Sequence, residues 1–175
     1  GSSATTTATL HVNVEAVADA PSLTVTTASG NEDTAIPLNI ATAVTDTDGS
    51  ESITSVIISG VPAGAVLNHG TNNGDGSWTL TPAQLAGLTI TPPHDSDVDF
   101  NLTVSTTSRE AANGSTATTT SSLHVNVNAV ADAPIATSHD VAGVPGTPIP
   151  LNIGAALTDT DGSESLTITV GPLPA

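Results

Sequence analysis

The sequence contains no cysteine and almost no positive charge. Without cysteine the chain can form neither a disulfide nor a thiolate metal site. One Lys or Arg residue stands against 17 Asp and Glu residues, which gives a formal net charge of −16. Binding to nucleic acid or to an anionic membrane surface depends on Lys and Arg, so we expect neither partner. No apolar run is long enough to span a bilayer, so we also expect no direct membrane contact.

Aromatic residues are scarce as well, since Trp78 and Phe100 are the only ones. The core must therefore be built from Val, Ile, Leu and Ala, and we expect it to be thin. Sugar-cleaving enzymes need a cleft beside their paired carboxylates, usually with aromatic platforms. The sequence also lacks lysine, a glycine-rich phosphate loop and a recognisable serine nucleophile turn. We therefore expect a protein without catalytic activity.

The most informative pattern is an internal repeat. The linker Ala16–Pro21 returns unchanged as Ala129–Pro134, an offset of 129 − 16 = 113 residues, and the same offset relates Asp46–Ser52 to Asp159–Ser165. A period of this length is that of a whole domain rather than of a solenoid repeat. The predicted parts are the terminal strand and linker of a preceding repeat (1–20), one complete repeat with its linker (21–133) and the first strands of a following repeat (134–175).

Short stretches rich in Thr and Val, with alternating apolar and polar residues, dominate the complete repeat. Clusters of Gly, Pro, Asn and Asp separate them, and this pattern predicts an all-β antiparallel sandwich. Thr81–Gln84 has the form of a capping box with proline at the first helical position, which predicts one helical turn. The predicted strands are 23–27, 35–41, 53–59, 65–68, 77–80, 88–91, 100–107 and 118–128.

The acidic residues gather in short clusters that a single Arg cannot neutralise. Their mutual repulsion would destabilise the fold unless a cation lay among them. Oxygen ligands without Cys favour a hard cation, and Ca²⁺ takes six to eight oxygens in flexible geometry. An EF-hand beginning at Asp46 would need Glu where Ile57 stands, so no single loop completes a site. The predicted calcium ligands are Asp19, Glu32, Asp33, Asp46, Asp48, Glu51, Asp95, Asp97, Asp99, Asp132, Asp159, Asp161 and Glu164.

Strand direction predicts which of these loops meet. Because consecutive strands of an antiparallel sandwich run in opposite directions, the loop 46–51 should lie at the end where the chain arrives from Asp19. The loops 32–33 and 95–99 should lie at the opposite end. Each junction between repeats would then collect acids from both of its neighbours. The alternative for 46–51 is a solvated turn with Gly49 in a left-handed conformation.

Several motifs together resemble a known class of surface protein. The Val-Ala-Asp-Ala-Pro linkers, Asn31–Thr34, Asp46–Glu51 and Leu85–Ile90 are similar to the immunoglobulin-like, cadherin-like extender repeats of giant RTX-type bacterial adhesins secreted by type I systems. The resemblance implies immunoglobulin-like domains joined by linkers that Ca²⁺ stiffens, with neighbouring repeats of the same chain as partners. It implies an extracellular stalk at the bacterial surface that projects a ligand-binding tip in attachment and biofilm formation.

One departure from the repeat concerns the predicted ligands. Pro145 and Gly146 stand where the complete repeat has Glu32 and Asp33, so the second repeat lacks two carboxylates at its far end. Equal stiffness at every junction is therefore not expected.

Two other functions stay open at this point. The repeat could itself bind a sugar or a protein through its surface loops, as many sandwich domains do. It could also be a self-assembling subunit of a surface layer or filament, in which the incomplete terminal repeats pair with neighbouring molecules.

Overall fold

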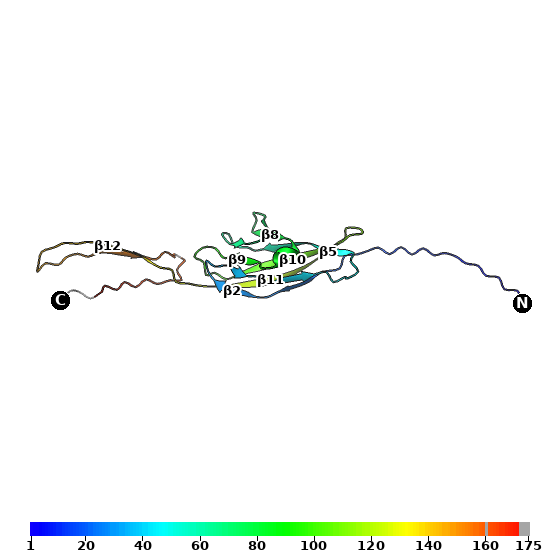
Figure 1. Cartoon of the computed structure of the whole chain (residues 1–175), viewed down its shortest axis with the longest axis horizontal. Coiled ribbons are helices and arrows are strands. Elements are labelled where there is room, and N and C mark those ends of the chain that lie inside the picture. Colours follow the sequence, from blue (N-terminus) through cyan, green and yellow to red (C-terminus); the bar gives the residue numbers. More distant parts are fainter. Residues whose placement is uncertain (160, 172–175) are drawn as a thin grey trace.

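A computed structural model describes residues 1–159 and 161–171 of the chain and has three parts in a row (Figure 1). An extended N-terminal segment leads into a central sandwich, residues 22–128, and a small hairpin follows at the opposite end. Thr160 and residues 172–175, which belong to the predicted following repeat, lie outside the described residues. Apart from one 3₁₀ turn, the elements of the described residues are all strands, and none of them is a helix able to cross a membrane.

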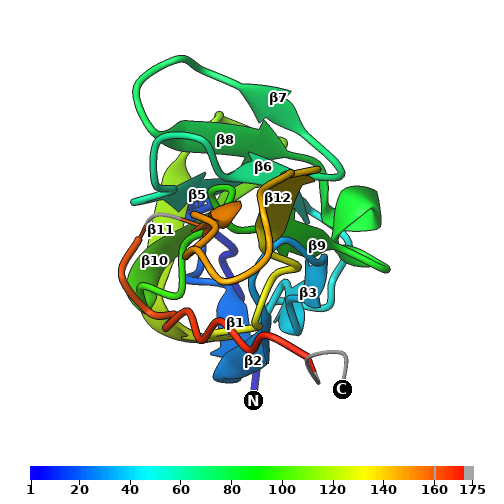
Figure 2. The same ribbon diagram turned by 90° about the vertical axis from the view of Figure 1, so that its left-hand side faces the viewer.

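The central sandwich is built from one large sheet and smaller sheets that face it (Figure 2). The large sheet has six strands in the order β2 (Ala28–Asn31), β11 (Thr116–Asn128), β10 (Phe100–Glu110), β5 (Glu51–Ser59), β8 (Ser77–Leu80) and β7 (Thr71–Asn72). The facing strands are β3 (Ile36–Pro37), β9 (Thr89–Thr91) and β6 (Val66–Leu67), with the pair β1 (Ser22–Val25) and β4 (Ile40–Ala43) beside them. The all-β sandwich expected from the sequence is confirmed at this level. The expectation that it is antiparallel is wrong at one edge, because β2 pairs in parallel with β11.

Aliphatic side chains fill the space between the sheets. Every second residue of β10 and of the second half of β11 points inward, so Leu102, Val104, Leu123 and Val125 are buried. They belong to one cluster that also contains Ile36 from the facing side. The opposite face of β10 and β11 carries mostly Ser and Thr. Alternation therefore fixes which side of each strand faces the core.

The predicted strand 35–41 is wrong as a single element, because the structure divides it into β3 and β4. Pro37 has no backbone N–H to continue the ladder. The N–H of Leu38 donates to the carbonyl of Leu88, whereas the carbonyl of Asn39 accepts from Thr26. The chain thus changes its partner strand between these two residues. The strands β2 and β7 were not predicted, since neither has an apolar alternation.

The helical turn is confirmed as the 3₁₀ helix η1 (Pro82–Leu85). The backbone N–H of Thr81 donates to Oε1 of Gln84 at 2.8 Å, as the capping box requires.

The C-terminal hairpin repeats the start of the central sandwich. Its strands β12 (Ile135–His139) and β13 (Asn152–Ala156) pair Ile135 with Ala156, and the central sandwich pairs Ser22 with Ala43 at the corresponding positions of β1 and β4. The two strand pairs therefore share their register as well as their sequence period. Residues 1–20 form no strand in the structure.

We predict that Ile58→Ala destabilises the central sandwich by about 2–5 kcal/mol, the usual cost of truncating a fully buried Ile. Its neighbour Ile57 lies on the outer face of the same strand and is 38% exposed, so Ile57→Ala is the matched control and should cost well under half as much. Urea denaturation of both variants measures the difference. Equal losses would contradict the assignment of the two faces.

Candidate metal centre

At one end of the central sandwich, which we call the upstream pole, the linker 16–20 lies against the domain. The backbone N–H of Asp19 donates to Oε1 of Glu51, and the carbonyl of Asp19 accepts from the hydroxyl of Ser108 at 2.5 Å. The hydroxyl of Thr45 donates to the carbonyl of Ala20 at 3.0 Å. These bonds bring Asp19 to the loop 46–51, as strand direction predicted.

The loop 46–51 is organised by its own carboxylates. Oδ1 of Asp46 accepts from the N–H of Asp48 at 2.9 Å, and Oδ1 of Asp48 accepts from the N–H of Ser50 at 2.7 Å. The Ser50 hydroxyl and N–H lower the pKa of Asp48 by hydrogen bonding to its ionised form. Gly49, with φ 91°, supplies the left-handed residue that the turn requires. Both Asp side chains are thus held in fixed orientations.

The second repeat has the same loop and the same contacts to its linker. Asp159 accepts from the N–H of Asp161 at 2.8 Å, and Asp161 accepts from the N–H of Ser163 at 2.7 Å. The N–H of Asp132 donates to Oε1 of Glu164, as Asp19 does to Glu51 in the first repeat. The arrangement of linker and loop is therefore a property of the repeat.

At the other end of the sandwich, the downstream pole, the turn after β2 places Glu32 under the outgoing linker. Oε1 of Glu32 accepts from the N–H of Val130 at 2.6 Å. Oδ1 of Asp33 accepts from the N–H of Asp95 at 3.0 Å, which joins the two acidic loops of this pole. Asp99 accepts from the N–H of Val127 at 2.7 Å and so fixes the end of β11.

Acids from both repeats meet between the downstream pole and the second repeat. Glu32, Asp159 and Asp161 each offer a carboxylate oxygen, and these atoms lie within 4.8 Å of one another. Glu32 is 3% exposed and Asp159 is 2% exposed, whereas Asp46, the counterpart of Asp159 in the first repeat, is only half-buried. Oε2 of Glu32 is buried and has no hydrogen-bond partner among the described residues. This group of carboxylates, the junction cluster, could hold a metal ion.

The electrostatics of the junction cluster are unfavourable without a cation. The hydrogen bond from Val130 is the largest influence on the pKa of Glu32 and lowers it, but burial and the charges of Asp159, Asp161 and Asp33 together raise that pKa above its ordinary value. The pKa of Asp161 is lowered, chiefly by hydrogen bonds from Ser163 and to a smaller degree by hydrogen bonding with Asp97. The repulsion within the junction cluster therefore shows most clearly at Glu32, whose ionised form it disfavours.

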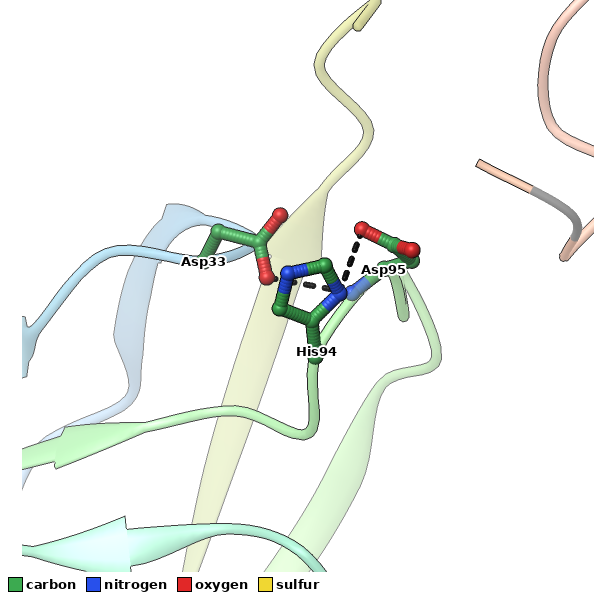
Figure 3. A group of neighbouring side chains, drawn as sticks. All are labelled: Asp33, His94 and Asp95. Carbon is green, nitrogen blue, oxygen red and sulfur yellow. Dashed lines mark hydrogen bonds and ion pairs between the residues drawn. The ribbon is translucent and has the colours of Figure 1, made fainter. Parts of the chain in front are cut away.

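A second group contains a histidine that sequence reasoning missed. Asp33, His94 and Asp95 lie within metal-ligand reach of one another (Figure 3), and Nδ1 of His94 lies 2.7 Å from Oδ1 of Asp95. The hydrogen bond to Asp95 comes first among the causes that raise the pKa of His94, followed by the charge of Asp33. His94 directly precedes Asp95 in the acidic loop, but a lone histidine gives no signal of this contact. Its imidazole can supply positive charge to the downstream pole.

Glu110 is a second residue that sequence reasoning missed. It lies opposite Glu51 in the pairing of β10 with β5, and it is 2% exposed. Its Oε1 accepts from the N–H of Ala112 at 3.0 Å, while Oε2 of Glu51 is buried without a hydrogen-bond partner among the described residues. The inward alternation of β10 from Leu102 onward was the available signal. Glu110 adds a carboxylate to the upstream pole.

The predicted ligands therefore divide between two poles and do not form a single site. The upstream pole holds Asp19, Asp46, Asp48 and Glu51, while the junction and downstream pole hold Glu32, Asp33, Asp95, Asp97, Asp99, Asp132, Asp159, Asp161 and Glu164. Carboxylate oxygens dominate both sets, and such donors suit hard cations.

Comparisons of the chain with models of protein families, with curated proteins and with solved structures gave no match.

We predict that Glu32 contributes more to the stability of the metal-free protein as the pH falls from neutrality through its raised pKa. A carboxyl group whose pKa is higher in the folded than in the unfolded state favours folding when protonated, and this contribution is lost as the pH rises. Thermal unfolding in chelator across this pH range measures this contribution as the difference in unfolding temperature between the original chain and the variant Glu32→Gln. The variant keeps an acceptor for Val130 but cannot ionise, so a pH response identical to that of the original chain would contradict the assignment.

Proposed function

We propose that this chain is a segment of a tandem array in which Ca²⁺ binds between successive sandwich domains and holds them in line. The array acts as an extracellular spacer of a bacterial surface adhesin and carries a ligand-binding tip away from the cell. The buried carboxylate of Glu32, which meets Asp159 and Asp161 of the next repeat, is the observation that carries this proposal. The cell-surface setting rests on the resemblance of the linkers and acidic loops to adhesin extender repeats.

Calcium is the cation that suits the donors at the junction. Glu32, Asp159 and Asp161 offer three converging carboxylates, and Asp97 and Asp132 lie at the same junction through their contacts with Asp161 and Glu164. Backbone carbonyls and water can complete a shell of six to eight oxygens. Mg²⁺ requires a stricter octahedron and dehydrates reluctantly, so it suits this irregular set less well.

The position of the cluster gives the ion a mechanical role. Its ligands come from two repeats that are otherwise joined by the linker 129–133, and Glu32 touches that linker through Val130. Without a cation, the carboxylates repel one another and favour separation of the two repeats. A bound ion reverses the sign of this interaction, so the junction closes and the linker loses its freedom to bend.

The rival function, recognition of a sugar or protein by each repeat, has less support. Trp78 is 8% exposed and belongs to the core, so it offers no platform for stacking on a sugar ring. One open groove is lined by aliphatic and small residues of β4, η1 and the loops beside them. A second is lined by the loops 61–65 and 72–76, and the small exposed part of Trp78 is its only aromatic surface. The spacer function requires no such platform.

We expect Ca²⁺ to narrow the distribution of distances across the junction. Because the chain has no cysteine, spin labels can be placed at Thr103→Cys on the outer face of β10 and at Ser138→Cys on β12, both exposed. Pulsed electron paramagnetic resonance should give a broad distribution of distances between the two labels in chelator and a narrow distribution in saturating Ca²⁺. If the width of the distance distribution in the labelled chain, with no other substitution, does not change on adding Ca²⁺, the spacer mechanism is refuted even if calorimetry detects Ca²⁺ binding.

The repeat itself supplies a matched pair of variants for this measurement. Asp159→Asn with Asp161→Asn removes two charges from the junction cluster and should abolish the narrowing. Asp46→Asn with Asp48→Asn makes the same change in the equivalent loop at the upstream pole, away from the labelled junction, and should leave the narrowing intact. Equal effects of the two pairs would contradict a role for the junction cluster.

We further predict that Glu32→Pro with Asp33→Gly, which copies the second repeat, removes calcium stiffening, although proline also removes the hydrogen bond that the Glu32 N–H donates to the carbonyl of Asn128 at 3.0 Å, so the domain should be less stable but still folded. The turn is the same in both repeats: Asp33 has φ 54° and Gly146 has φ 83°, and the hydroxyls of Thr34 and Thr147 each donate at 2.8 Å to the carbonyl three residues earlier. Calorimetry should show Ca²⁺ affinity reduced at least about tenfold, as expected when a site loses charged ligands. Unchanged affinity would place the ion elsewhere.

A further inference from the structure

The turn between β10 and β11 holds the linker that enters the central sandwich. The side-chain amide of Asn113 donates to the carbonyl of Ala16 at 2.5 Å, and the hydroxyl of Ser115 accepts from the N–H of Ala18 at 3.2 Å. The turn fixes these side chains, because Oδ1 of Asn113 also accepts from the N–H of Ser115 at 2.9 Å. Two side chains without charge therefore bind the main chain of the linker.

The contact continues to the start of the sandwich. The hydroxyl of Thr119 donates to the carbonyl of Pro21 at 2.7 Å, and Pro21 is buried. The two linker residues before Pro21 are bonded to the domain as well, so five of the six residues 16–21 take part. Among these bonds, only the one that Glu51 accepts involves a charged side chain. The contact between linker and domain therefore does not depend on a cation.

The linker that leaves the sandwich at its opposite end is bonded to it far less (Figure 1). After Asn128, the last residue of β11, the bond from the N–H of Val130 to Glu32 is the only hydrogen bond between residues 129–133 and the sandwich within the described part of the chain. Its acceptor is a carboxylate of the junction cluster, where the acids repel one another without a cation. The same linker sequence is thus held firmly at the entry of a domain and weakly at the exit.

We propose that the turn between β10 and β11 is the docking site for the linker, and that each linker moves as part of the domain it enters. Residues 129–134 repeat the sequence of residues 16–21. An array without bound metal therefore bends between Asn128 and Ala129, where one domain ends and the docked linker of the next begins. The docking stands on the contacts of this domain alone, whereas its consequence for an array rests on the proposed function.

Docking also positions a predicted calcium ligand. The N–H and the carbonyl of Asp19 are both bonded to the domain, by Glu51 and Ser108, while the Asp19 side chain is exposed at the upstream pole. The linker and the acidic loop of the domain that follows a junction are therefore assembled before an ion binds. The ion then has a single joint to close.

Amide hydrogen exchange in chelator tests the docking. The N–H of Asp19 should be protected at least about tenfold more than that of Val17, which has no acceptor among the described residues. Asn113→Asp with Ser115→Ala removes two bonds to the linker but keeps the acceptor of the Asp19 N–H. This double variant should reduce the protection of Asp19 to that of Val17.

The control for this measurement is Asn72→Asp. It makes the same exchange of an amide for a carboxylate in the turn after β7, where Oδ1 of Asn72 accepts from the N–H of Gly74 and no bond reaches the linker. The control should leave the protection of Asp19 unchanged. Equal protection of Asp19 and Val17 in the original chain would overturn the docking, and so would protection of Asp19 that survives in the double variant.

Spin labels locate the joint, since the chain has no cysteine of its own. Val17 lies 22 − 17 = 5 residues before β1 and Ala133 lies 133 − 128 = 5 residues after β11, and both are exposed. Paired with Thr103→Cys in chelator, Val17→Cys should give a narrow distribution of distances and Ala133→Cys a broad one. Equal widths would overturn the position of the joint. Both measurements are made without Ca²⁺, so a failure of calcium stiffening leaves their expected results unchanged.

Discussion

Repulsion among the carboxylates that gather at each pole of the sandwich dominates the electrostatics of this chain. The chain carries 17 acidic residues and one basic residue, and strand direction delivers most of the acids to loops at the ends of the domain. The outer face of β10 and β11 between the poles consists largely of Ser and Thr, with Arg109 as the only charged side chain on these two strands' outer face. Charge of one sign is therefore concentrated where one repeat meets the next, and the imidazole of His94 is too little positive charge to balance the carboxylates there.

Backbone hydrogen bonds hold the acidic loops in place independently of any ion. The Asp19 N–H bonds to Glu51 and the Asp132 N–H bonds to Glu164, so the linker meets each domain in the same way. Carboxylates that accept backbone N–H groups are fixed in orientation. On the proposed function, the ion then binds a preorganised set of ligands, and its binding energy is used to join two repeats rather than to fold a loop.

The sequence was a good guide wherever a pattern extended over many residues or recurred. The 113-residue offset, the alternation of β10 and the direction of the strands together located Asp19 beside Glu51 and Glu32 beside the second repeat. Single residues were harder. The division of 35–41 into β3 and β4 depends on tertiary contacts of Leu38, and His94 and Glu110 acquire their surroundings from chain segments distant in sequence. The composition identified the acidic residues as candidate ligands, but their separation into two groups at opposite ends of the domain is determined by the fold.

The comparison of the turns at Glu32 and Pro145 separates the architecture of a junction from its charge. Both turns contain a left-handed residue and the same threonine hydroxyl bond, so the local conformation of this turn does not require the acids. The two turns differ in charge, because Glu32 and Asp33 present two carboxylates to the following repeat and Pro145 and Gly146 present none. On the proposed function, the stiffness of each junction is a local property that depends on two side chains of one turn. On the proposed function, a stalk of similar domains can then combine rigid segments with compliant joints, because exchanging two acids for Pro and Gly alters the electrostatics of one junction while the turn keeps its conformation.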